Sequence, residues 1–367
     1  MNDATLTNIP RLADSTDRHA IMPANRYLLW GGRLLKFGVS AAVLAYLIRD
    51  AMVNATFTQL AEQAKNWPRL GAAFAVGFVA VLVTIVRWFV LVRALAIPFT
   101  LHDALRLGFL GYLFNFVSLG SVGGDLFKAI FLAREQPTRR PESVASVVVD
   151  RAVGLYGLFV LASLALLVVG RDTLASHETR VLAQGTWIAT AVGTVTILAL
   201  LLPGATGGTL SQWLCKLPKI GGTFAKLIGA VRIYRRRMGV IVATIAMSVL
   251  SHGLFATTIY LLATGLPGQA PTFLEHLAIV PLAMVTGILP LPLSGLGAFE
   301  GVLDYLYRSA SVVGPQILKG QGLVVALAYR AVTIAIAVVS CVFYLGQRQE
   351  VDAVMHEAEE LQESAAA

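Results

Sequence analysis

Six stretches of the chain are each long and apolar enough to cross a lipid bilayer, and this pattern constrains the fold more than any other feature. A spanning helix needs about 20 mainly apolar residues. Only 14% of the residues are charged, against roughly 25% in an ordinary soluble domain. The six stretches cover about 28–48, 70–92, 144–170, 181–203, 239–263 and 321–345. The sequence therefore predicts an all-α integral membrane protein.

Two further apolar stretches, about 104–132 and 274–308, are interrupted by polar, glycine-rich breaks. The first break reads Ser118-Leu-Gly-Ser-Val-Gly-Gly-Asp125, and the second reads Pro290-Leu-Pro-Leu-Ser-Gly-Leu-Gly-Ala-Phe-Glu300. Each half is too short to cross alone, and irregular backbone at membrane depth needs partners from protein or from a wet cavity. We expect two re-entrant helical hairpins, the alternative being short loops between tilted spans.

Charge orients this arrangement and divides the chain. The loop 204–238 carries seven Lys and Arg residues and no acidic residue, whereas 264–275 carries no Lys or Arg. Because positive charge favours the cytoplasmic side, the loop and both termini are expected there, in a bacterial-type inner membrane. The predicted parts are a cytoplasmic segment 1–27, a membrane domain 28–345 and an acidic cytoplasmic tail 346–367.

The two breaks also mark an internal repeat. The first leads to Asp150-Arg151-Ala-Val and the second to Tyr329-Arg330-Ala-Val, each within a long apolar run. Two units, about 28–170 and 181–345, can thus be superposed, each with three crossings and one hairpin. An odd number of crossings turns the second copy over, so the pattern predicts the inverted repeat of many transporters.

Arginine inside an apolar span is a functional candidate, because an ionisable group in the membrane costs several kcal/mol unless it is paired or hydrated. At about 1.5 Å per residue, Arg151 lies about 10 Å and Arg330 about 13 Å into their spans. One hypothesis is that both guanidinium groups bind a lipid phosphate. The alternative is a structural ion pair with Asp125, Asp150, Glu300 or Asp304, or snorkelling to head groups.

The breaks supply further candidates for a polar site. Asp125 and Glu300 follow the turns, where a carboxylate caps a helix, pairs with an arginine or accepts a proton. Glycines there either let backbone approach a ligand or allow close helix packing. The remaining candidate residues are Gly120, Gly123, Gly124, Gly295 and Gly297, with Asn115, Ser118, Ser121 and Ser294 as hydrogen-bonding side chains.

No motif for soluble catalysis is present: the sequence has no nucleotide-binding loop and no metal-spaced His or Cys cluster, so we expect no cofactor, no metal and no nucleic acid. The predicted function is translocation of a polar-headed lipid, with a membrane-embedded lipid or polyprenyl-glycan transferase or an accessory subunit as the alternative. The expected partners are an anionic or phosphate-bearing membrane lipid and either a second copy of the chain or an enzyme of a lipid pathway.

The order of these motifs resembles the transmembrane domain of lysylphosphatidylglycerol synthases and their stand-alone, flippase-like relatives. The matching pieces are Ser118 to Asp125, Ser146-Val-Val-Val-Asp-Arg151 and Leu291 to Glu300. The resemblance implies movement of a polar-headed lipid between leaflets. Because it covers only the membrane half of the synthases, lysine transfer is not expected. The chain departs from the family pattern in lacking a proline in the first break and in having Asp150 where Glu is more usual.

Overall fold

The computed structural model describes residues 62–117, 123–169, 177–201, 232–288, 297–310 and 317–345, together with Arg49. Five helices among these residues are long and apolar enough to cross a membrane, which confirms five of the predicted spans. They are α3 (Trp67–Ala94), α6 (Arg140–Val169), α7 (His177–Leu201), α10 (Met238–Gly265) and α14 (Gln321–Leu345). The predicted span at 28–48, the acidic tail and most of the basic loop lie outside the described residues.

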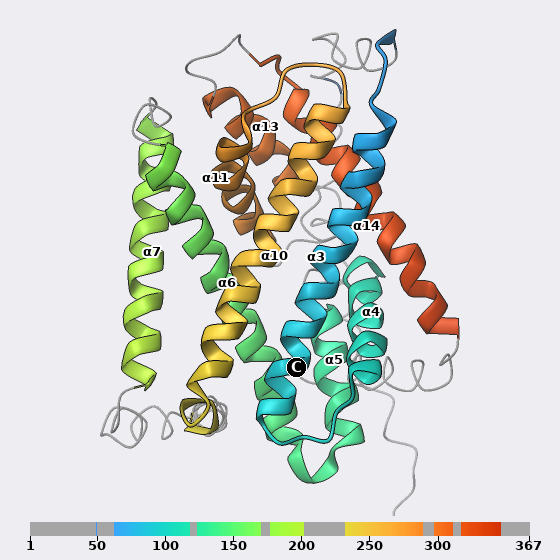
Figure 1. Ribbon diagram of the computed structural model, residues 1–367, viewed down its shortest axis with the longest axis vertical. Helices are drawn as coiled ribbons and strands as arrows, with labels where there is room; N and C mark the ends of the chain where they lie inside the picture. Colours follow the sequence, from blue (N-terminus) through green and yellow to red (C-terminus); the bar gives the residue numbers. More distant parts are fainter. Residues whose placement is uncertain are drawn as a thin grey trace, which may run out of the picture.

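Four shorter helices form two pairs at the positions of the interrupted stretches. Hairpin one consists of α4 (Leu101–Val117) and α5 (Gly123–Glu135), and hairpin two of α11 (Phe273–Met284) and α13 (Ala298–Ala310). Short 3-10 helices, η1 (Pro137–Arg139) and η3 (Val285–Ile288), precede α6 and extend α11. The helices of each pair pack against each other. Hairpin one lies toward the lower end of the molecule and hairpin two toward the upper end (Figure 1).

Both hairpins begin with the same local hydrogen-bond exchange. Thr272 and Glu275 form a capping box at the start of α11, in which each side chain accepts from the other residue's backbone N–H. Before α4, the Thr100 N–H donates to Asp103 at 3.0 Å, and the Asp103 N–H donates to the Thr100 hydroxyl at 3.2 Å. These exchanges satisfy N–H groups that a helix start leaves open. The Thr-x-x-Asp and Thr-x-x-Glu sequences therefore fix where each hairpin begins.

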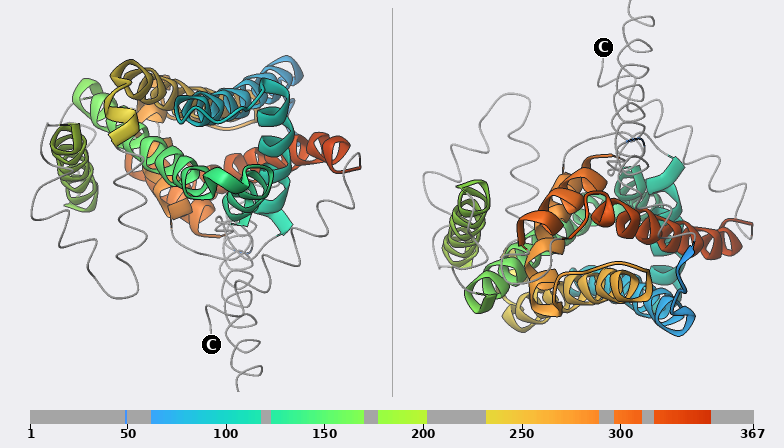
Figure 2. Two further views of the ribbon diagram at one scale, coloured as in Figure 1. Left: turned by 90° about the horizontal axis from the view of Figure 1, so that it is seen from below. Right: turned by 90° about the horizontal axis from the view of Figure 1, so that it is seen from above.

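Each half of the molecule has its own hydrophobic core. The first is built mainly from α3, α4, α5 and α6 around Trp88, Leu107 and Leu110, and the second from α10, α11, α13 and α14 around Ile259 and Leu303. Helices α3 and α10 pack along each other and join the halves. In addition, α4 contacts α14 and α11 contacts α6. Each hairpin thus packs on a long helix of the other half, as the end-on views also show (Figure 2).

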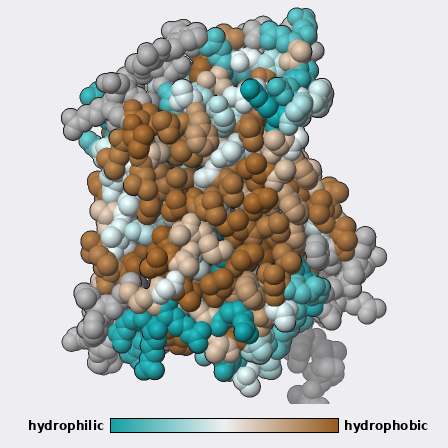
Figure 3. Space-filling model, viewed as in Figure 1, coloured by the Kyte–Doolittle hydropathy of each residue, from teal (hydrophilic) through white to brown (hydrophobic). Residues whose placement is uncertain are grey.

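The outer surface is apolar across the middle of the face seen in Figure 3. In Figure 3 hydrophobic residues cover most of the central zone of the visible face, and hydrophilic residues gather at the two ends. Large apolar side chains such as Leu167, Ile188 and Val242 are more than half exposed. Such a continuous apolar surface is too large for a soluble monomer and matches contact with lipid tails.

Candidate functional site

The Asp125 carboxylate is the centre of the site in the first half. It lies near the start of α5, which places it beside α6, and one of its oxygens, Oδ2, accepts a hydrogen bond from Arg151. The other oxygen, Oδ1, lies 3.9 Å from the Lys128 ammonium, one helical turn further along α5. The Arg151 side chain is 53% exposed whereas that of Asp125 is 12% exposed. One carboxylate is therefore shared by two cations, one of them accessible.

A second buried ion pair lies next to this one. Arg87 on α3 donates to both oxygens of Asp150 on α6, from Nε at 2.8 Å and from Nη2 at 3.1 Å. Its remaining nitrogen, Nη1, donates to the Ser248 hydroxyl on α10 at 2.9 Å. This two-pronged geometry is the strong form of an Arg–carboxylate contact. Because Asp150 directly precedes Arg151, the pair also fixes the rotation of α6 and hence the position of Arg151.

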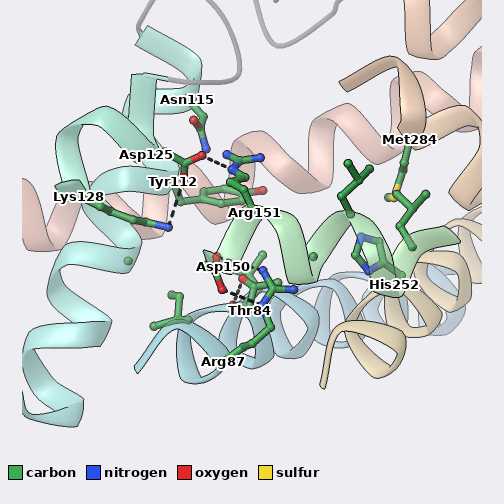
Figure 4. A pocket seen from close by; sticks show the side chains of 16 residues that line it. Thr84, Arg87, Tyr112, Asn115, Asp125, Lys128, Asp150, Arg151, His252 and Met284 are labelled. Atoms are coloured by element: carbon green, nitrogen blue, oxygen red, sulfur yellow. Dashed lines mark hydrogen bonds and ion pairs between the residues drawn. The ribbon is translucent and has the colours of Figure 1, made fainter. Parts of the chain in front are cut away.

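A cavity of about 510 Å³ connects these groups. Helices α3, α4, α5 and α6 supply most of its wall, and α10 and α11 close one end with His252 and Met284. Its polar lining consists of Thr84, Arg87, Tyr112, Asn115, Asp125, Lys128, Asp150, Arg151 and His252. Figure 4 shows Lys128 and Arg151 directed toward Asp125, with the Arg87–Asp150 pair on the adjoining wall. The volume falls in the range of pockets that hold one small molecule or head group.

The two helices of hairpin one are in direct backbone contact, with no side chain between them. A Cβ on Gly124 would lie 1.9 Å from the Gly111 carbonyl oxygen, so α4 and α5 touch directly at this level. The Gly124 N–H donates to the Asn115 side chain at 3.1 Å. For Gly124, close helix packing is thus what the structure shows, and Asn115 satisfies an open N–H at the start of α5.

Hairpin two carries the corresponding carboxylate–arginine pair, but both of its side chains are less exposed than those at hairpin one. Glu300 is fully buried, and its Oε1 accepts from Arg330 on α14 at 2.7 Å from Nη2 and 3.2 Å from Nε. Its other oxygen accepts the Gly297 N–H at 2.7 Å. Gly297 has φ 89°, a conformation that favours glycine. Glu300 therefore both pairs with Arg330 and caps the turn into α13.

The structure brings together most of the residues that the sequence singled out. Arg151 pairs with Asp125 and Arg330 with Glu300, two of the pairings considered above, while Asp150 pairs with Arg87. Asp304 pairs with neither Arg151 nor Arg330: it accepts the Gly320 N–H at 2.9 Å, just before α14, and lies 3.5 Å from Arg308. Candidates outside the described residues are Ser118, Gly120, Ser121, Ser294 and Gly295.

Five polar side chains of the cavity were not singled out from the sequence: Thr84, Arg87, Tyr112, Lys128 and His252. Arg87 had a usable signal, since it is a charged residue inside an apolar span. Lys128 and His252 had the same kind of signal, since they are ionisable residues within the apolar stretches 104–132 and 239–263. Within the described residues, no group of three or more metal-binding side chains is present.

The apolar helices, together with the carboxylate–arginine pairs at the two hairpins, define an integral membrane protein with a chamber lined in part by charged groups. The family model of the lysylphosphatidylglycerol synthase TM region matches residues 33–341. The chain therefore belongs to this family over nearly its whole length. Comparison with curated proteins found no match.

Proposed function

We propose that this protein is a lipid translocase that moves a polar-headed, phosphate-bearing lipid between leaflets of the cytoplasmic membrane. The observation that carries the proposal is the half-exposed Arg151 guanidinium at an open chamber of about 510 Å³ between apolar helices. A guanidinium fork binds phosphate oxygens well, and the chamber gives the head group a polar environment. The acyl tails stay in the surrounding lipid, against the apolar outer surface.

The proposal includes an architecture of two inverted units with re-entrant hairpins. Three observations support it: both hairpins begin with the same capping exchange, the two carboxylate–arginine pairs occupy equivalent places, and the hairpins lie toward opposite ends of the molecule (Figure 1). Transporters with inverted repeats hold their substrate where the two units meet. A head group entering at one hairpin would then leave by way of the other.

The two arginines take different parts in this scheme. Arg151 is exposed enough to contact a phosphate in the described conformation. After the phosphate leaves, Arg151 can pair with Asp125 again. Arg330 is only 17% exposed and faces a fully buried Glu300, so its contact with a phosphate requires that this pair first open. Family membership supports a lipid substrate without naming the lipid.

The test is a leaflet-exchange assay in reconstituted vesicles. A fluorescent phosphatidylglycerol is placed in both leaflets of phosphatidylcholine vesicles, and an impermeant reductant added outside bleaches what reaches the outer leaflet. We expect the wild-type protein to make all of the probe accessible and Arg151→Ala to slow exchange at least tenfold, since a charge-assisted contact is lost.

Arg106→Gln is the matched control, because Arg106 pairs with Glu135 on hairpin one and does not line the chamber. It should exchange lipid at the wild-type rate. Folded wild-type protein that leaves the probe distribution unchanged would overturn the proposal. Mass spectrometry of the same vesicles would reveal a transferase through chemical conversion of the lipid.

A further inference from the structure

The chamber in the first half holds more positive than negative charge. Among its lining residues, Arg87, Lys128 and Arg151 face only two carboxylates, Asp125 and Asp150. Arg87 and Asp150 neutralise each other through two hydrogen bonds. The remaining carboxylate, Asp125, is shared by Lys128 and Arg151. An excess charge away from bulk water is costly until an anion compensates it.

Lys128 is the cation that Asp125 satisfies least. Its ammonium is 3.9 Å from the nearer carboxylate oxygen, which is too long for a hydrogen bond, whereas Arg151 bonds directly to the other oxygen. The ammonium also lies 5.4 Å from the centre of the Trp88 ring, within the range of a cation–π contact. That ring holds the side chain in the chamber without neutralising its charge.

The second half lacks this excess. When Asp125 is matched with Glu300 and Arg151 with Arg330, the position of Lys128 is taken by Leu303 and that of Asp150 by Tyr329. Leu303 is fully buried in the second core. The pair Glu300–Arg330 is thus electrically balanced. Among the described residues, the cation at this position occurs in the first half and not in the second, so the carboxylate–arginine pair that both halves share does not account for it.

We propose that Lys128 makes the chamber selective for lipids whose head groups carry a net negative charge, over zwitterionic lipids of similar size. The head-group phosphate lies in the chamber beside Asp125, within reach of both Lys128 and Arg151, and its one negative charge balances the excess. A zwitterionic head group brings an ammonium that meets Arg87 and Arg151 without a carboxylate left to pair with it. This inference rests on the proposed function and adds the charge class of the substrate.

The experiment compares two fluorescent probes, phosphatidylglycerol and phosphatidylethanolamine, in phosphatidylcholine vesicles that contain the full chain. We expect wild-type protein to exchange the anionic probe about tenfold faster, the effect of one added charge-assisted contact. Lys128→Met keeps the apolar stem and removes the charge, so the ratio of the two rates should fall toward one. Lys128→Arg should keep the ratio, and Arg106→Gln, which removes a cation from the same hairpin outside the chamber, should not change it.

The outcomes separate this inference from the proposed function. Equal rates for the two probes in wild-type protein, or an unchanged ratio in Lys128→Met, would overturn the charge selectivity while leaving translocation intact. No exchange of either probe by folded protein would overturn translocation itself. Should Lys128→Met fold poorly, the ratio in Lys128→Gln, which keeps a polar side chain, decides the question in the same way.

Discussion

Hairpin one and hairpin two present the same chemical pair in opposite surroundings. In each, a carboxylate at the start of the second hairpin helix meets an arginine of the following long helix. In the first half the arginine is half exposed and the carboxylate also faces Lys128. In the second half the carboxylate is fully buried and an additional backbone N–H completes its hydrogen bonds.

The difference shows that the properties of a carboxylate–arginine pair depend on the side chains around it. Lys128 and Asp150 make the first site a charged, open chamber, whereas Leu303 and Tyr329 stand at the matching positions of the second. A buried, fully bonded ion pair mainly enforces one arrangement of its helices. An accessible pair can exchange partners, and this is what binding an anionic head group requires.

The largest effect expected from this comparison is the loss of stability in Glu300→Ala. Removing the carboxylate leaves Arg330 buried without its partner, which should lower the free energy of unfolding by about 3–5 kcal/mol. Thermal unfolding in detergent, followed by size-exclusion chromatography, measures it.

Asp125→Ala should cost less, because the exposed Arg151 regains contact with water or head groups. Replacing Glu300 and Arg330 together by methionine should restore much of the lost stability. Equal losses for Glu300→Ala and Asp125→Ala would remove the distinction between the two sites.

The second prediction concerns the closed form of hairpin one. Gly124→Ala would place a methyl group 1.9 Å from the Gly111 carbonyl oxygen, so α4 and α5 must separate, at a cost of about 1–3 kcal/mol or more. Both unfolding temperature and lipid exchange should fall. Gly71→Ala is the matched control, because in α3 a Cβ at this position meets no atom within 4 Å. A Gly124→Ala protein with wild-type stability would argue against direct helix contact at this level.

A smaller effect is expected for Ser248→Ala. The variant removes the hydroxyl that accepts from Arg87 Nη1 but leaves both hydrogen bonds to Asp150, so the loss should be about 1–2 kcal/mol. Ser251→Ala tests the same helix, since the Ser251 hydroxyl donates only to the Ser248 carbonyl, and it should be close to neutral. If the two serine variants lose equal stability, Arg87 does not depend on its contact with α10.

A small change in stability is expected for Arg151→Ala, together with the large loss of lipid exchange that the proposed function predicts. An ion pair with a half-exposed partner contributes about 0–1 kcal/mol. Measured on the same preparation, the variant should therefore unfold near the wild-type temperature and exchange lipid much more slowly. A loss of stability comparable with that of Glu300→Ala would make Arg151 a structural residue and weaken the proposed function.

The sequence predicted the five described long helices because each is a continuous apolar run. The polar breaks in two further runs indicated where pairs of shorter helices stand, and the re-entrant course of these pairs stays a prediction. The pairing of Arg151 with Asp125 and of Arg330 with Glu300 was one of the alternatives that the sequence indicated, since few buried charges are available in a membrane domain. For these features the signal lies within a short segment of chain.

What the sequence did not reveal depends on contacts between distant segments. Arg87 and Asp150 are 63 residues apart, and nothing local to either indicates the other. The chamber is lined by residues from α3, α4, α5 and α6, and the close approach of α4 to α5 at Gly111 and Gly124 likewise joins residues that are not neighbours in sequence. Glycine in an apolar helix permits both close packing and ligand access, so sequence alone did not distinguish the two readings.

Helix α7 has a consequence of a different kind. Within the apolar part of α7, only 11% of the residues in the most apolar stretch are buried. Its side-chain hydrogen bonds to α6 include those of Thr190 and Thr194. In Figure 1 it runs from the end of the molecule where α6 finishes to the end where α10 begins. It thus connects the two ends of the molecule, and a helix in this position needs sufficient length and an apolar surface but few specific contacts. Among the described helices, α7 should therefore tolerate substitutions best, provided that its surface stays apolar.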